Sequence, residues 1–159
     1  MSRRVEDYLA MTALNDGTAR ALTRGVGEDE ARRRFGGRSS FRWILGHVAE
    51  HRAVPLEILG GDRASKFDLS TAFARDTAPT DDATPTLAEL LEEFLRFGAL
   101  LGARVRELGD AAFERTHRTP AGVELPTPAF FYFHETYHLG QLGLLRTWLG
   151  KPPLVPPQR

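Results

Sequence analysis

The sequence predicts an all-α protein, a four-helix bundle with a long crossover between its second and third helices. Four segments of the 159-residue chain repeat apolar residues with helical spacing. Glycine and proline residues separate these segments. The polar connection 62–85 is long enough to run the length of a bundle, so the helices on either side of it can be parallel neighbours.

Serine and glycine residues mark the limits of the first two helices. The first helix is expected over about 5–22, and a glycine-containing turn follows it. The second helix begins after Ser40, whose hydroxyl can cap the first turn, and it ends at Gly60. Both helices are therefore bounded by residues that suit helix ends.

The third and fourth helices have clear starting signals. Thr86 is followed three residues later by Glu89, which is the pattern of a capping box. The fourth helix opens with Thr127 as its expected cap and Pro128 in its first turn. Residues 123–125, between these two helices, suit a short extended piece.

Composition excludes several classes of protein. Lys plus Arg and Asp plus Glu both total 21, so neither nucleic acid nor an anionic membrane is an expected partner. No apolar run resembles a signal peptide or a bilayer span, and we expect a cytoplasmic protein with a single domain over 1–159. Cysteine is absent, so a metal must be held by histidine, carboxylate, carbonyl or water.

The fourth helix carries the strongest functional pattern. His134 and His138 are four residues apart, so their imidazoles lie on one helix face. Large apolar residues share that face, and two inward imidazoles are hard to satisfy by ordinary hydrogen bonds. The pair therefore indicates a metal site. Tyr137 and Gln141 lie on the same face, where they can assist a reaction or simply pack.

The second helix offers another pair with the same spacing, His47 and His51. Both fall within a wide apolar arc, so periodicity does not choose between them as a third ligand. His51 also suits a boundary position facing solvent or a neighbouring helix. His117 is expected in a loop as an ordinary surface histidine, although a loop across the open end of the bundle can bring it near substrate.

His134 to His138 also matches the H-E-x-x-H pattern of zinc proteases, in which the glutamate is the general base. Those enzymes take a third ligand from downstream, but residues 139–159 contain no histidine, aspartate or glutamate. The match is therefore interpreted as a coincidence. Glu135 stays a candidate for orienting a ligand or receiving a proton.

These residues together resemble the DinB-like family of metal-binding four-helix bundles, which includes YfiT-type proteins. The resemblance covers essentially the whole chain. It rests on three stretches: Trp43-x-Leu-Gly-His47, His134-x3-His138-x-Gly-Gln141-Leu, and Leu144-Leu-Arg-x-Trp-Leu-Gly150 followed by prolines.

The resemblance implies an up-down-down-up bundle with His47, His134 and His138 as metal ligands, water in the remaining position, and His51 outside the ligand set. It implies zinc or nickel as the metal and a homodimer formed through bundle helices. It also implies a small-molecule substrate, since some members transfer a small electrophile to a low-molecular-weight thiol such as bacillithiol or mycothiol.

Three functional hypotheses follow. The first is a metal-dependent enzyme, similar to thiol S-transferases, which predicts an open metal position beside a cavity. The second is a non-catalytic metal-binding stress or scaffold bundle, which predicts a closed shell with His51 as fourth ligand. The third is a metal-dependent hydrolase that activates water at the same site.

Overall fold

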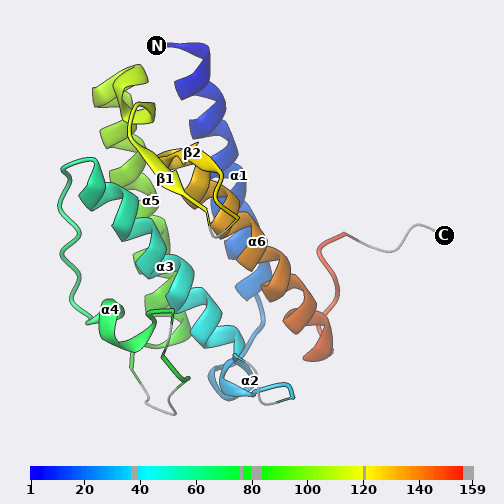
Figure 1. The fold of residues 1–159 in the computed structure, drawn as a ribbon. Coiled ribbons are helices and arrows are strands. Elements are labelled where there is room, and N and C mark those ends of the chain that lie inside the picture. Colours follow the sequence, from blue (N-terminus) through cyan, green and yellow to red (C-terminus); the bar gives the residue numbers. More distant parts are fainter. Residues whose placement is uncertain (37–38, 76, 80–83, 120, 156–159) are drawn as a thin grey trace.

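The computed structural model describes residues 1–36, 39–75, 77–79, 84–119 and 121–155. Four long helices form the body of the molecule, and short elements connect them (Figure 1). The elements are α1 Arg3–Thr23, α2 Glu28–Arg32, α3 Phe41–Ile58, α4 Leu69–Ala72, α5 Leu87–Leu108, the 3₁₀ helix η1 Gly109–Phe113, β1 Thr116–Arg118, β2 Glu124–Pro126 and α6 Thr127–Trp148.

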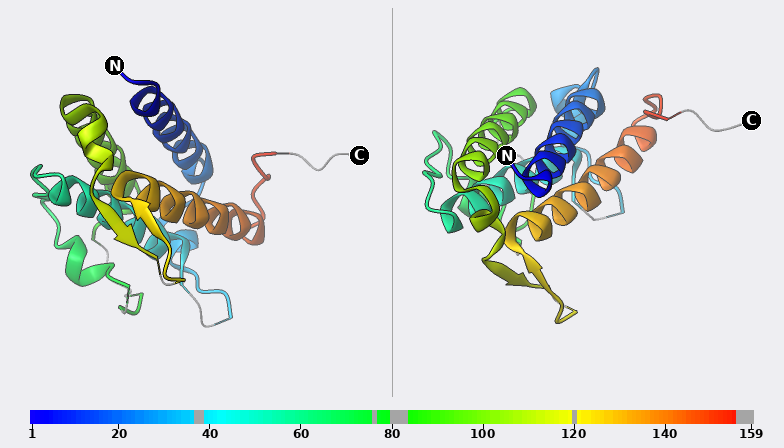
Figure 2. Two further views of the ribbon diagram at one scale, coloured as in Figure 1. Left: turned by 45° about the horizontal axis from the view of Figure 1, so that its top comes forward. Right: turned by 90° about the horizontal axis from the view of Figure 1, so that it is seen from above.

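The long helices follow the predicted order. Helices α1 and α6 run in one direction, and α3 and α5 run in the other, so α3 and α5 are parallel neighbours (Figures 1 and 2). The chain between them returns along the bundle and includes the short helix α4 (Figure 1). The predicted all-α, up-down-down-up bundle with a long crossover is confirmed.

The expected capping residues act as predicted at α3 and α5. The Ser40 hydroxyl accepts a hydrogen bond from the Trp43 amide at 3.2 Å. At α5, the Thr86 hydroxyl accepts from the Glu89 amide at 3.2 Å, and Glu89 Oε2 accepts from the Thr86 amide at 2.8 Å. Side chains thus satisfy amides that the first turn leaves without helical partners.

The start of α6 differs from its prediction. Pro126 occupies the capping position without a side-chain cap, and Thr127 is the first helical residue. The Thr127 amide instead donates to the Arg115 carbonyl at 2.8 Å. The antiparallel pair β1 and β2 brings that carbonyl to the helix start, so a main-chain group replaces the expected hydroxyl.

The crossover contains a short helix, α4, that its polar composition did not predict. Asp68 caps α4 by accepting a hydrogen bond from the Thr71 amide at 3.1 Å. Leu69 and Phe73 are buried, so this single turn packs against the bundle. A Cβ atom at Gly46 would lie 2.4 Å from the Phe73 ring, so only glycine lets this segment approach α3 so closely. Residues 76 and 80–83 of the crossover lie outside the described part.

Among the described residues, no helix is both long enough and apolar enough to cross a lipid bilayer.

Candidate metal centre

Four histidines converge between α3 and α6. His47 and His51 stand on successive turns of α3, and His134 and His138 stand on successive turns of α6. The ring centroids lie 4.1 Å apart for His47 and His51, 4.4 Å for His51 and His134, 4.5 Å for His134 and His138, and 4.9 Å for His47 and His138. Two pairs with the predicted spacing therefore meet as one cluster.

The nitrogen positions fit a divalent cation. His47, His51 and His134 each offer a nitrogen, and these nitrogens all lie within 4.8 Å of one another. His138 Nε2 lies 3.2 Å from His134 Nε2. Two imidazole ligands of a tetrahedral zinc ion, each bonded at about 2.0–2.1 Å, have nitrogens roughly 3.3 Å apart. The His134–His138 pair already has that separation.

The crossover orients the ring of His47. Its Nδ1–H donates to the Phe73 carbonyl at 2.8 Å, and the ring stacks on Trp43 with centroids 4.9 Å apart. Because the carbonyl can only accept, the Nδ1 atom carries the proton and Nε2 keeps its lone pair. The close approach at Gly46 brings Phe73 into place, so Gly46 and His47 contribute together to the site.

His138 is oriented by residues of its own helix. Its Nδ1–H donates to Gln141 Oε1 at 2.7 Å, which leaves Nε2 with a lone pair. Gln141 Nε2 in turn donates to the Tyr137 hydroxyl at 3.1 Å. The candidates Gln141 and Tyr137 therefore lie at the site, and Gln141 holds the His138 ring.

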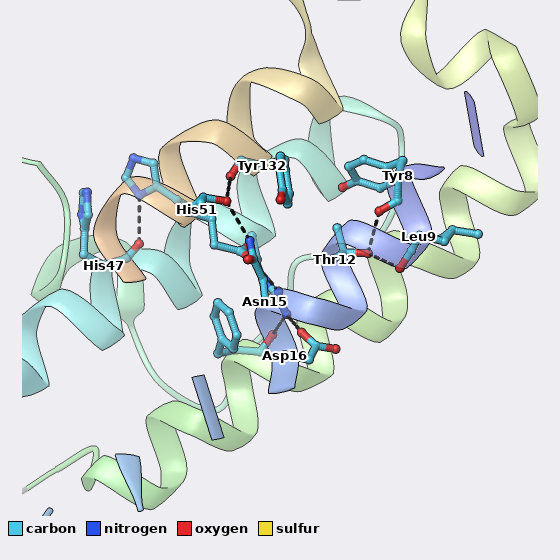
Figure 3. A network of polar contacts seen from close by, with 12 residues as sticks. Tyr8, Leu9, Thr12, Asn15, Asp16, His47, His51 and Tyr132 are labelled. Atoms are coloured by element: carbon cyan, nitrogen blue, oxygen red, sulfur yellow. Dashed lines mark hydrogen bonds and ion pairs between the residues drawn. The ribbon is translucent and has the colours of Figure 1, made fainter. Parts of the chain in front are cut away.

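His51 has acceptors of a different kind. Its Nδ1–H lies 3.0 Å from the His47 carbonyl (Figure 3) and 2.7 Å from Glu50 Oε2. Burial alone would raise the pKa of Glu50, but the hydrogen bond from His51 and the charge of Arg63 lower it overall. A histidine held by a carboxylate is also a common arrangement in metal sites. One of its ring nitrogens lies within 4.8 Å of nitrogens of His47 and His134, so His51 is also within reach of an ion bound there. Its place outside the ligand set stays a prediction.

His134 is the least satisfied of the four imidazoles. Its Nδ1 atom is buried and has no hydrogen-bond partner among the described residues. Its Nε2 atom faces the lone-pair nitrogen of His138. Several imidazole nitrogens so close together, on a ring that also has a buried nitrogen without a partner, are costly for a core but suit a bound cation.

Burial favours the neutral form of His47, His134 and His138. Burial, with a smaller contribution from the nearby His51, lowers the pKa of His47 to about 4 and that of His134 to about 3. Burial also lowers the pKa of His138, although the hydrogen bond to Gln141 acts in the opposite direction. Neutral imidazole is the form that binds metal, so these side chains are ready to act as ligands at pH 7.

We expect the metal-free protein to lose stability as the pH falls from about 6.5 towards 4. The ordinary histidine pKa is 6.5, so in this window the unfolded chain binds protons that folded His47 and His134 refuse. Above pH 7 both states are neutral at these positions and the effect vanishes. Urea unfolding of chelator-treated protein at pH 5 and pH 7.5 measures it. A His47→Leu, His134→Leu variant that loses as much stability between these pH values would contradict the assignment.

A cavity of about 860 Å³ opens beside the cluster. All five histidines of the sequence line it, together with aromatic side chains of α3 and α6. His117 reaches it from β1, where its ring lies 4.2 Å from that of Phe130 and 5.3 Å from that of Phe131 between centroids. The antiparallel hairpin thus brings His117 to the site, a placement that the sequence offered only as the weaker reading.

Glu135 is engaged elsewhere. Its two carboxylate oxygens accept hydrogen bonds from Arg52, from Nε to Oε2 at 2.5 Å and from Nη2 to Oε1 at 2.7 Å. The Asn15 amide also donates to Oε1 at 2.8 Å. Asn15 and Asp16 extend from α1 into this network (Figure 3), and Arg52 Nη1 bonds Asp16 at 2.6 Å. The carboxylate predicted as a possible proton acceptor therefore joins three helices.

The Arg52 side chain depends on a glycine that the sequence analysis did not single out. A Cβ atom at Gly98 of α5 would lie 2.1 Å from Arg52 Nη1. The guanidinium carbon lies 3.5 Å from the centroid of the Phe94 ring, and Nη1 also donates to the Phe94 carbonyl at 2.9 Å. No periodic pattern points to this network, because each helix contributes only one or two polar residues to it.

Comparison with known proteins adds one finding. The family model described as the DinB superfamily matches residues 14–142, a stretch that contains all five histidines. A search of curated proteins found no match.

Proposed function

Because the chain belongs to the DinB superfamily, we propose that it is a metal-dependent enzyme, similar to thiol S-transferases, that acts on a small molecule. The observation that carries this proposal is the large cavity directly against the histidine cluster. A purely structural metal site is closed by its protein ligands, whereas a catalytic site keeps a position open to substrate.

We propose His47, His134 and His138 as the ligands of a zinc or nickel ion. The His134–His138 nitrogen separation of 3.2 Å and the oriented Nε2 atoms of His47 and His138 support this set. Three neutral imidazoles suit either metal. When bound, the metal would lower the pKa of a thiol or a water molecule and so supply a nucleophile at neutral pH.

The chain's own residues would position the reactants. Cysteine is absent, so a thiol must come from a cosubstrate. Tyr137 accepts a hydrogen bond from Gln141, which leaves its O–H free to donate to a group in the cavity that it lines. Transfer would form a carbon–sulfur bond, break the bond from carbon to the leaving group, and release the thiol proton to solvent.

Two alternatives keep specific support. The fourth imidazole, His51, supports a non-catalytic metal-binding stress or scaffold bundle, because four histidines can close a tetrahedral shell. The open cavity equally suits a metal-dependent hydrolase that activates water instead of a thiol.

We also propose that the protein forms a homodimer. Support comes from two large apolar side chains, Leu144 and Trp148, that α6 exposes four residues apart and away from the cavity. Residues so spaced lie along one helix face, and a self-complementary face of this kind suits a two-fold interface.

Thiol binding can be tested on protein loaded with cobalt(II). We expect mercaptoethanol to produce the intense near-ultraviolet absorption of a thiolate bound to cobalt, while its oxygen analogue ethylene glycol produces none. We also expect conjugation of mercaptoethanol to monochlorobimane to be more than about tenfold faster with metal-loaded protein than with metal-free protein. The reason is that activation of the nucleophile by the metal lowers the barrier by several kcal/mol.

The two readouts separate the hypotheses. Metal binding without the thiolate absorption would argue against a transferase and favour a hydrolase or a non-catalytic bundle. Ester hydrolysis by the same metal-loaded preparation would then distinguish these two. The His138→Ala variant is the matched control, because it removes one proposed ligand and leaves the cavity open.

A further inference from the structure

We infer that the cavity beside the histidines takes an organic carboxylate with a flat apolar body, held by Arg75 and Arg118. Binding of the carboxylate does not depend on the proposed function. Only its role as a substrate rests on that function. The residues that carry the inference lie outside the ligand set. Arg75 follows α4 in the crossover, and Arg118 ends strand β1, so two separate connections place a guanidinium on the same cavity.

Among the described residues, the charged side chains that line the cavity are all basic. Arg75 and Arg118 line it, and no aspartate or glutamate is among the described residues that do so. Across the whole chain, acidic and basic residues are equal in number. The imbalance is therefore local to this cavity, and a cavity with apolar walls and charges of one sign attracts ligands of the opposite sign.

Both guanidinium groups are available to a ligand. Arg75 is exposed, and within the described ranges no side chain forms a hydrogen bond or ion pair with it. It lines the same cavity as His134. Arg118 has Glu124 as a partner at 3.8 Å, with both side chains largely exposed. Such an exposed pair contributes little, so Arg118 can turn to a bound anion at small cost.

Aromatic side chains supply the walls for an apolar body. Trp43 stacks on His47, and His117 lies against Phe130 with an interplanar angle of 30°. Phe133 also lines the cavity, although 64% of its surface is exposed, and a bound ring would cover it. A planar guanidinium pairs with a carboxylate through two hydrogen bonds. A flat acid therefore satisfies both features of the cavity.

Calorimetric titration with phenylacetate and its neutral analogue phenylacetamide tests the inference. The titration uses chelator-treated protein, so that the carboxylate has no metal to bind. We expect phenylacetate to bind at least about tenfold more tightly than phenylacetamide, because charge-assisted hydrogen bonds form only with the acid. In the Arg75→Met, Arg118→Met double variant, we expect phenylacetate affinity to fall to that of phenylacetamide, with phenylacetamide affinity unchanged.

The matched control is an Arg20→Met, Arg106→Met double variant. Both of these arginines are exposed and neither lines the cavity, so this variant changes the net charge equally. It should retain the preference for phenylacetate. Equal binding of the acid and the amide to the unsubstituted protein, or an equal loss in both double variants, would overturn the inference. Because the titration omits metal, its result is independent of the metal content and thiol absorption that test the proposed function.

Discussion

Replacing Arg52 with methionine is expected to lower the free energy of unfolding by about 3–5 kcal/mol. The change leaves the Glu135 carboxylate with only the Asn15 amide as a side-chain partner from another helix. Arg52 is 3% exposed and Glu135 is 6% exposed, so neither charge can turn to water. A buried charge without its partner costs far more than an exposed ion pair contributes.

Urea unfolding at pH 7 measures this effect. An Arg52→Met, Glu135→Leu double variant removes both charges and should regain most of the lost stability, since apolar replacement of a whole buried pair is close to neutral. Arg3→Met removes an ion pair whose side chains are 85% and 55% exposed, and it should change stability by less than about 1 kcal/mol. A similar decrease in the free energy of unfolding in the Arg52→Met and Arg3→Met variants would contradict the claim that burial makes the Arg52–Glu135 ion pair costly to break.

The second large effect is expected at the histidine cluster. The His134→Ala variant should lose metal, from about one ion per chain to nearly none after reconstitution with zinc and dialysis. His134 belongs both to the proposed ligand set and to the group of three nitrogens within 4.8 Å. Of the three proposed ligands, only His47 and His138 would remain, and two imidazoles do not make a stable structural or catalytic zinc site. Elemental analysis gives the metal content, and circular dichroism checks that the variant stays helical.

A matched pair of variants identifies the third ligand. We expect His138→Ala to lose metal as well, because His138 and His134 already have the nitrogen separation of two zinc ligands. His51→Ala should keep metal near the level of the unsubstituted protein. The reverse result, with loss at His51 and retention at His138, would assign His51 to the shell and remove His138 from it.

The long helices and the two histidine pairs were predictable from sequence because they depend on local spacing. A capping box such as Thr86 and Glu89 satisfies main-chain groups within one turn, and a four-residue step aligns two imidazoles within one helix. Helix order was predictable for a different reason. A connection as long as 62–85 allows parallel neighbours, and the structure has them.

Contacts between distant segments were not predictable in the same way. The hydrogen bond from His47 to the Phe73 carbonyl joins residues 26 positions apart, and the Arg52–Glu135 pair joins residues 83 apart. A main-chain carbonyl has no signature in the sequence. Glu135 illustrates the difficulty further: its neighbour His134 directs attention to metal chemistry, but one step along a helix turns a side chain by about 100°. The carboxylate therefore meets α1 and α3 residues instead.

The residues that line the cavity belong partly to packed helices and partly to connecting segments. The proposed metal ligands stand on α3 and α6, whereas Arg75 belongs to the crossover and Arg118 to the hairpin. Connecting segments tolerate insertion and exchange far better than packed helices do. A change at Arg75 or Arg118 can thus alter which molecule the cavity holds, while Phe73, which orients His47, and the proposed metal ligands stay in place. In the proposed enzyme, the metal chemistry and the choice of substrate would depend on different parts of the fold, so each could be redesigned without the other.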